Sequence, residues 1–205
     1  FARVSASSYI ESASSESPPV SLALPGQPAS AFTAGLSASA EEAGAAPGGT
    51  RTYTFSAGRP GTFLYEAGHT PGGARQVAMG LAGALVVRAA DGSAYGARSG
   101  YPATPYDDDA VLVLSEIDPA LNAAPATFDM RSFHPAYRLI NGKPYPSTDP
   151  VSIDQGHRVL LRYVNVGSQT HSMSLLGGDQ TQVAGDGHPL RYAESAVTLA
   201  VEPGA

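Results

Sequence analysis

Residues 50–88, TRTYTFSAGRPGTFLYEAGHTPGGARQVAMGLAGALVVR, decide the fold. Two short parts of this stretch carry aromatic side chains at every second position: Tyr53, Phe55, Phe63 and Tyr65. Because side chains two residues apart on a β-strand point to the same face, this spacing predicts strands over residues 52–56 and 61–67. The Gly- and Pro-rich residues between them supply turn geometry, so we predict that the two strands form a β-hairpin.

An apolar run closes the unit. Residues 81–87 are too few for a lone helix and are rich in Val and Leu, so they predict a strand that is buried on both sides. The Gly-rich residues before this run predict a turn.

Composition limits the class of protein. The chain has 205 residues, 42% of them hydrophobic and 15% charged, which is typical of a folded globular protein with a real core. Its 23 Gly and 17 Pro imply many turns and favour an all-β fold. A net charge of −6 makes a nucleic-acid partner unfavourable, and no apolar run approaches the length of about 20 residues that a membrane span needs.

The sequence contains no cysteine. A blue (type 1) copper centre uses a Cys thiolate beside two His side chains, so this chain cannot hold such a centre by itself. Disulfides and thiolate metal sites are excluded for the same reason.

Further strands are predicted along the rest of the chain from apolar runs, alternation and turn signals. The run at 111–116 is apolar on both faces and is predicted to be a central strand. Asn141-Gly142 is a strong hairpin turn signal. The remaining predicted strands lie at 20–24, 156–165, 170–177, 182–187 and 197–201.

Two polar segments separate these strands. Residues 91–105 combine Gly, Ser, Tyr and Pro without periodicity, which is typical of an interdomain linker. The triplet Asp107-Asp108-Asp109 follows it. We interpret this triplet as a solvated strand entry rather than a metal site, because consecutive strand residues point to opposite faces.

Several of these pieces carry a family resemblance. GTFLY at 61–65, Gln76 and GLAGALVV at 80–87 resemble the first cupredoxin domain of the multicopper oxidases, the laccase-like copper enzymes. LINGKPYP at 139–146 is similar to the opening of the second such domain. The resemblance covers most of residues 50–200.

The resemblance implies an all-β fold with two tandem Greek-key cupredoxin-like β-sandwiches. The first domain, residues 1–100, would be reduced and would begin with an irregular segment. The second domain, residues 107–205, would be incomplete, because a cupredoxin sandwich needs two or three more strands after 197–201. We expect those strands to come from further cupredoxin polypeptide, in the same chain or in a partner within an oligomer or complex.

The family's copper ligands are not matched residue for residue. In the family, a His-x-His pair that binds a trinuclear copper cluster follows the tyrosine that corresponds to Tyr65. Glu66 and Gly68 occupy those positions here, and His69 lies one place beyond them. His69 and Glu66 are therefore candidate metal ligands, although the strand register turns His69 away from the ligand position unless Gly68 permits a bulge.

His171 and Met173 form a second candidate metal pair. Residues at positions i and i+2 of a strand point to the same side, and imidazole with thioether is a recognised copper(I) ligand set. The alternative is that His171 is a hydrogen-bonded core or interface residue, because two ligands are too few. His134, His157 and His188 are interpreted as exposed loop residues.

Function is inferred from the resemblance. It implies a segment of an oxidoreductase that couples one-electron oxidation of a substrate to reduction of dioxygen to water, with copper bound in the complete protein and this chain inactive alone. The alternative is a non-catalytic cupredoxin-like subunit that binds other proteins. The resemblance also implies a secreted or cell-envelope location.

Overall fold

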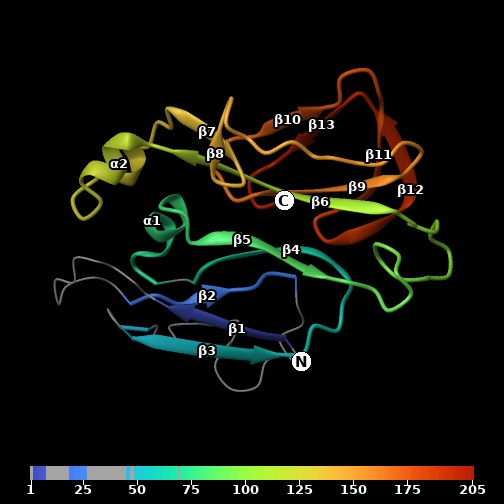
Figure 1. The fold of residues 1–205 in the computed structure, drawn as a ribbon. Helices are drawn as coiled ribbons and strands as arrows, with labels where there is room; N and C mark the ends of the chain where they lie inside the picture. The colour runs from blue at the N-terminus through green and yellow to red at the C-terminus, as the bar shows by residue number, and fades with distance from the viewer. Residues whose placement is uncertain (1, 8–18, 27–44, 47–48, 69) are drawn as a thin grey trace.

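The computed structural model describes residues 2–7, 19–26, 45–46, 49–68 and 70–205. Within these residues strands predominate, and the helices are short. Figure 1 shows two layered halves, with β1 to β5 on one side and β6 to β13 on the other. We call them the N-terminal half and the C-terminal half. The predicted all-β fold is confirmed.

The N-terminal half contains two small sheets. One pairs β1 with β3, and the other has the order β2-β4-β5, with β4 antiparallel to both neighbours. The strand bounds are β1 Ala2–Ser7, β2 Leu22–Ala23, β3 Thr50–Phe55, β4 Gly61–Ala67 and β5 Ala82–Val87.

The predicted hairpin between residues 52–56 and 61–67 is wrong, although both strands exist. β3 pairs with β1, and β4 pairs with β2 and β5, so the Gly- and Pro-rich link crosses from one sheet to the other. Tyr53 and Phe55 are buried against Leu22 and Leu24. The alternating aromatic side chains therefore fill the space between two layers of a sandwich.

The Gly-rich segment before β5 also differs from its prediction as a plain turn. It contains helix α1, Gly73–Ala78, whose Ala, Arg and Gln residues favour helix formation. Gly80 follows with a φ of 102°, a conformation that glycine adopts without a steric penalty and that ends the helix.

The C-terminal half contains a four-stranded sheet of order β8-β7-β6-β9, in which β6 runs parallel to β9. The pairs β10-β13 and β11-β12 are separate antiparallel ribbons. The strand bounds are β6 Asp108–Ile117, β7 Tyr137–Ile140, β8 Lys143–Pro144, β9 Val159–Asn165, β10 His171–Ser174, β11 Gln180–Gly185, β12 His188–Ala196 and β13 Thr198–Val201.

The predicted central strand at 111–116 is confirmed, because β6 lies between β7 and β9. Asn141 and Gly142 form the predicted turn between β7 and β8, with φ angles of 51° and 77°. The segment after β6 holds helix α2, Pro119–Ala123, capped by the Asp118 carboxylate, and a 3₁₀ turn, Met130–Ser132. Sequence patterning missed β12. His188 begins this strand and is therefore not the loop residue that was predicted.

The two halves meet through polar and packing contacts between β4 and the C-terminal half. Arg162 of β9 donates from Nη1 to Thr62 Oγ1 of β4 at 2.9 Å. Gly187, in the turn between β11 and β12, lies against the Phe63 ring of β4. The neighbouring His188 Nε2 lies 3.0 Å from a guanidinium nitrogen of Arg59. The tip of the β11-β12 ribbon therefore docks on the N-terminal half.

Candidate functional site

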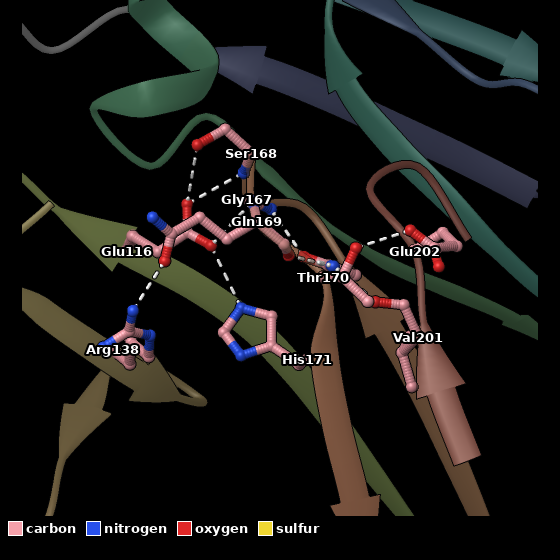
Figure 2. A network of polar contacts seen from close by, with 10 residues as sticks. Glu116, Arg138, Gly167, Ser168, Gln169, Thr170, His171, Val201 and Glu202 are labelled. Atoms are coloured by element: carbon pink, nitrogen blue, oxygen red, sulfur yellow. Dashed lines mark hydrogen bonds and ion pairs between the residues drawn. The ribbon is translucent and has the colours of Figure 1, made fainter. Parts of the chain in front are cut away.

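A buried carboxylate near the end of β6 accepts four hydrogen bonds. The Glu116 side chain is only 1% exposed. Its Oε2 accepts hydrogen bonds from the Ser168 backbone N–H at 2.8 Å and the Ser168 hydroxyl at 3.2 Å, and its Oε1 accepts one from the Gln169 backbone N–H at 3.2 Å. The loop between β9 and β10 thus wraps its backbone around this carboxylate, as Figure 2 shows.

His171, on β10, completes the set of donors to Glu116. Its Nε2 lies 3.0 Å from Glu116 Oε1, and its side chain is 11% exposed. A carboxylate only accepts hydrogen bonds, so this contact places the ring proton on Nε2. A carboxylate that orients an imidazole in this way is also the usual second-shell partner of a metal-binding histidine.

Met173 lies two residues along β10, and both side chains are half-buried while their neighbours are exposed. The predicted placement of His171 and Met173 on one side of the strand is therefore confirmed by the burial pattern. These two donors are fewer than the three that a copper site such as the blue-copper centre uses. A copper ion at this position would need a donor from elsewhere.

The other predicted ligands lie in the N-terminal half. Glu66 is half-buried near the end of β4, opposite Ala23 and Ala82 in the sheet register. His69 lies outside the described residues. Within the residues that the structure describes, no three His, Asp or Glu side chains are grouped so that they could hold a metal ion. Copper binding by Glu66, His69, His171 and Met173 therefore stays a prediction.

Further hydrogen bonds stiffen the loop that surrounds Glu116. The buried Asn165 side chain donates to the carbonyl oxygens of Gln169 and Val201, at 2.8 and 2.9 Å. Arg138 of β7 donates to Gln169 Oε1 at 2.8 Å. These bonds tie β7, β9 and β13 to the loop that precedes β10.

A second charged cluster lies at the opposite end of β6, where the aspartate triplet begins the strand. Asp109 pairs with the exposed Arg88 at 3.1 Å and with Arg162, whose side chain is 2% exposed, also at 3.1 Å. Burial alone raises the pKa of Asp109, but hydrogen bonds from Arg88 and Arg162 outweigh it and leave the pKa below its usual value. Asp109 therefore belongs to a partly buried ion-pair network, and the prediction of a solvated strand entry is wrong for this residue.

The other two aspartates are more exposed. Asp107 accepts hydrogen bonds from the Arg158 side chain and backbone, which lower the pKa of Asp107 to about 2. Asp108 Oδ2 lies 2.8 Å from His157 Nδ1. Each carboxylate of the triplet thus has a cationic or imidazole partner of its own.

A cavity of about 560 Å³ opens beside this cluster. Its walls include β9, β11, β13 and the middle of β4, together with Tyr95 and Tyr106 from the segment that joins the halves. Burial raises the pKa of Tyr95. The cavity follows β9 over most of its length, since every residue from 158 to 164 contributes to its wall.

Sequence reasoning missed the roles of Glu116 and Arg162. Both are charged residues placed inside apolar, alternating strands, which is the available signal, because Glu and Arg are rarely fully buried without a partner. The partners themselves, His171 and Asp109, lie far away in the sequence and are revealed only by the fold.

No helix among the described residues is both long and apolar enough to cross a membrane. The sequence matches no protein-family model, and no curated protein matches it.

The structure, by contrast, is similar to known copper proteins. A blue copper oxidase from Nitrosomonas europaea is 26% identical, with a TM-score of 0.63, and the match covers 78% of this chain and 48% of that one. The multicopper oxidase mgLAC is 25% identical, with a TM-score of 0.61 and the same coverage. A copper nitrite reductase from Nitrosomonas europaea is 22% identical, with a TM-score of 0.64. The match covers 93% of this chain and 63% of the reductase chain, and it supports the fold alone.

The chain therefore spans about half the length of the two oxidases. The predicted resemblance to the multicopper oxidases and laccases is confirmed. In fold, the chain is a multicopper oxidase-like cupredoxin segment.

Proposed function

We propose that this chain is the scaffold segment of a multicopper oxidase-like oxidoreductase. In the proposed reaction, a reducing substrate loses electrons one at a time, and dioxygen takes up these electrons together with protons to give water. Copper would carry the electrons when bound in the complete protein. We also propose that residues 1–100 and 107–205 are two cupredoxin-like domains, and that the protein acts in the cell envelope or outside the cell.

The structural similarity to two oxidases at 25–26% identity carries this proposal, together with a coverage of 48% of each oxidase chain. The absence of cysteine supports the proposal that this chain supplies the scaffold and another part of the protein binds the type 1 copper. A type 1 copper requires a thiolate that this chain does not contain. The Cys-containing copper domain would be supplied by further cupredoxin polypeptide, in the same or another chain.

The chain's own residues would then act by holding geometry. Glu116 fixes the loop between β9 and β10 through two backbone N–H groups, and Arg162 joins β9 to β4 of the other half. The loop between β9 and β10 and the contact between β9 and β4 would already be fixed by hydrogen bonds before a copper domain docks on this scaffold. Such preorganisation positions a reactive group at low entropic cost.

The test is the copper content and oxidase activity of the protein as it occurs in its source, measured with its intact mass. A polypeptide longer than 205 residues, or a complex, that contains copper and consumes dioxygen with a phenol or a reduced metal ion supports the proposal. A copper-free species of 20.9 kDa without oxidase activity would contradict it and favour a non-catalytic cupredoxin-like binding subunit.

His171→Ala separates a structural role from a metal role. The substitution removes one of the four hydrogen bonds to the buried Glu116, so we expect a loss of about 1–2 kcal/mol in the free energy of unfolding. Copper content, measured by elemental analysis after incubation with copper and dialysis, is expected to stay unchanged. A loss of stoichiometric copper in the variant would assign His171 as a ligand.

A further inference from the structure

We propose that His188 is a pH-sensitive latch that holds the tip of the β11-β12 ribbon on the N-terminal half. In its neutral form the imidazole accepts a hydrogen bond from Arg59, and in its protonated form it cannot. Acidification therefore releases the tip. This inference does not depend on the proposed function, because it concerns a junction within the chain itself.

The turn before His188 is a two-residue hairpin loop. Gly185 pairs with His188 in the register of the ribbon, so Asp186 and Gly187 alone form the loop. Both loop residues have positive φ angles, 48° and 67°, as a type I′ turn requires and as an Asp-Gly pair favours. The backbone therefore fixes the position of His188 at the first residue of β12.

Two contacts determine which nitrogen of the imidazole carries the proton. Nδ1 lies 2.6 Å from the carbonyl oxygen of Asp186, which can only accept, so the ring proton lies on Nδ1. Nε2 lies 3.0 Å from a guanidinium nitrogen of Arg59, which can only donate, so Nε2 is the unprotonated acceptor. The neutral ring with its proton on Nδ1 satisfies both partners. A second proton, on Nε2, would place one cation directly against another.

The charged groups around the ring do not compensate for that second proton. On the N-terminal half, the ring faces Arg59 of the link between β3 and β4, and the adjoining part of β4 contributes the uncharged Phe63. Within the ribbon, the nearest charged residues in sequence are Asp186 and Arg191. No carboxylate among the described residues forms an ion pair with His188 or with Arg59. The protonated ring therefore loses a hydrogen bond and gains a repulsion.

The direction of the pH effect follows from proton binding. Histidine is the side chain that ordinarily changes charge between about pH 5 and pH 8, and arginine keeps its charge over this range. The docked tip requires a neutral His188, whereas the free tip binds the proton without penalty, so docking is linked to the loss of a proton. Docking is therefore strongest at neutral and higher pH and weakens on acidification.

The latch lies beside the packing contact that its release would loosen. Gly187 lies against the Phe63 ring, so closely that an added Cβ would stand 2.6 Å from it. The Arg59 guanidinium lies over the same ring, 5.4 Å from its centroid. Phe63 and Gly187 also line the cavity of about 560 Å³, one from β4 and the other from the ribbon. Undocking of the tip would therefore open the cavity wall between the two halves.

NMR of the full 205-residue chain tests the latch. Relaxation dispersion of the Phe63 ring and Gly187 signals measures the population of the undocked tip. In the wild type we expect this population to rise about 10-fold from pH 8 to pH 5, because one hydrogen bond is lost and one repulsion is added. In His188→Gln, whose side-chain oxygen accepts at every pH, we expect no change with pH. The imidazole nitrogen shifts at pH 8 are expected to show the proton on Nδ1.

A wild-type population that is the same at both pH values would overturn the proposal. An equal rise in His188→Gln would also overturn it, since another group would then be responsible. Arg59→Met removes the facing cation, keeps an apolar side chain beside Phe63 and is expected to abolish the pH dependence, so a remaining rise in this variant would place the switch elsewhere and contradict the latch. Copper does not enter this experiment, so the latch and the proposed function can fail independently.

Discussion

The two ends of β6 bury acidic side chains in different ways. Asp109 and Glu116 are an odd number of residues apart, so they point to opposite faces of the sheet. Asp109 is 17% exposed and is neutralised by the side chains of Arg88 and Arg162. Glu116 is 1% exposed and receives two backbone N–H groups, a hydroxyl and an imidazole.

This difference separates two structural roles. The Asp109 end joins the halves, since Arg162 also bonds to Thr62 of β4. The Glu116 end closes the C-terminal half on itself, because all of its donors belong to the loop after β9 and to β10. Long side chains bridge separate layers, whereas backbone donors fix a single loop, so substitutions at the two ends should have different consequences.

The largest effect is expected for Arg162→Met. Methionine keeps most of the apolar volume of the side chain but leaves the Asp109 carboxylate with only the exposed Arg88 and removes the bond to Thr62. We expect the free energy of unfolding in urea to fall by about 3–4 kcal/mol, as when a buried ion pair loses one partner. The matched control is Arg158→Met, which breaks only the exposed pair with Asp107 and should leave the midpoint almost unchanged. Equal effects of the two substitutions would remove the distinction between bridging and surface arginines.

Glu116→Gln tests the other end with a nearly identical shape. The amide NH₂ of glutamine would face a donor among Ser168, Gln169 and His171, so one contact becomes donor against donor. We expect a loss of about 2–3 kcal/mol in the free energy of unfolding. Because Glu116 does not bridge the halves, the exchange rates of amides in β4 should stay at their wild-type values. Faster exchange in β4 would show that this cluster also supports the junction.

The sequence predicted the strands better than their partners. Alternation located β3, β4 and β9 because the period of a strand is local, but it carries no information on which strand lies beside which. The predicted pairing of β3 with β4 failed for this reason, since the Gly- and Pro-rich link crosses between two sheets instead of reversing within one. Helix α1 was missed because its glycines outweighed its helix-forming residues in a short segment.

The candidate sites show the same limit. His171 and Met173 could be placed on one side of a strand from their spacing, and the structural alternative of a hydrogen-bonded His171 agrees with its contact to Glu116. Glu116 and Arg162 could not be assigned, because their partners are 55 and 53 residues away in sequence. Long-range ion pairs depend on the strand register, which only tertiary packing specifies.

Gly187→Ala tests the docking of the β11-β12 ribbon at the Asp109 end. Gly187 has a φ of 67°, and a Cβ there would lie 2.6 Å from the Phe63 ring. We expect a loss of about 2 kcal/mol from backbone strain together with this clash, measured by urea unfolding. Gly177→Ala is the matched control, because its φ is 82° but a Cβ there meets nothing within 4 Å. If both variants lose the same stability, the ribbon tip does not press on Phe63.

The smallest effect is expected at Asp107, which lies at the same end of β6 but is exposed to solvent. Arg158 lowers the pKa of Asp107 from 3.8 to about 2, so the ionised form is favoured in the folded state. Its contribution to stability is complete above pH 3.8 and is lost as the pH falls toward 2, because the unfolded state binds the proton first. In Asp107→Asn, the urea midpoint should therefore fall less steeply than in the wild type between pH 4 and pH 2, and the two curves should converge at the acid end. Parallel curves would show that the Arg158 contact does not lower the pKa of Asp107. The ionised Asp107 would then contribute nothing to stability at the end of β6 where Asp109 lies.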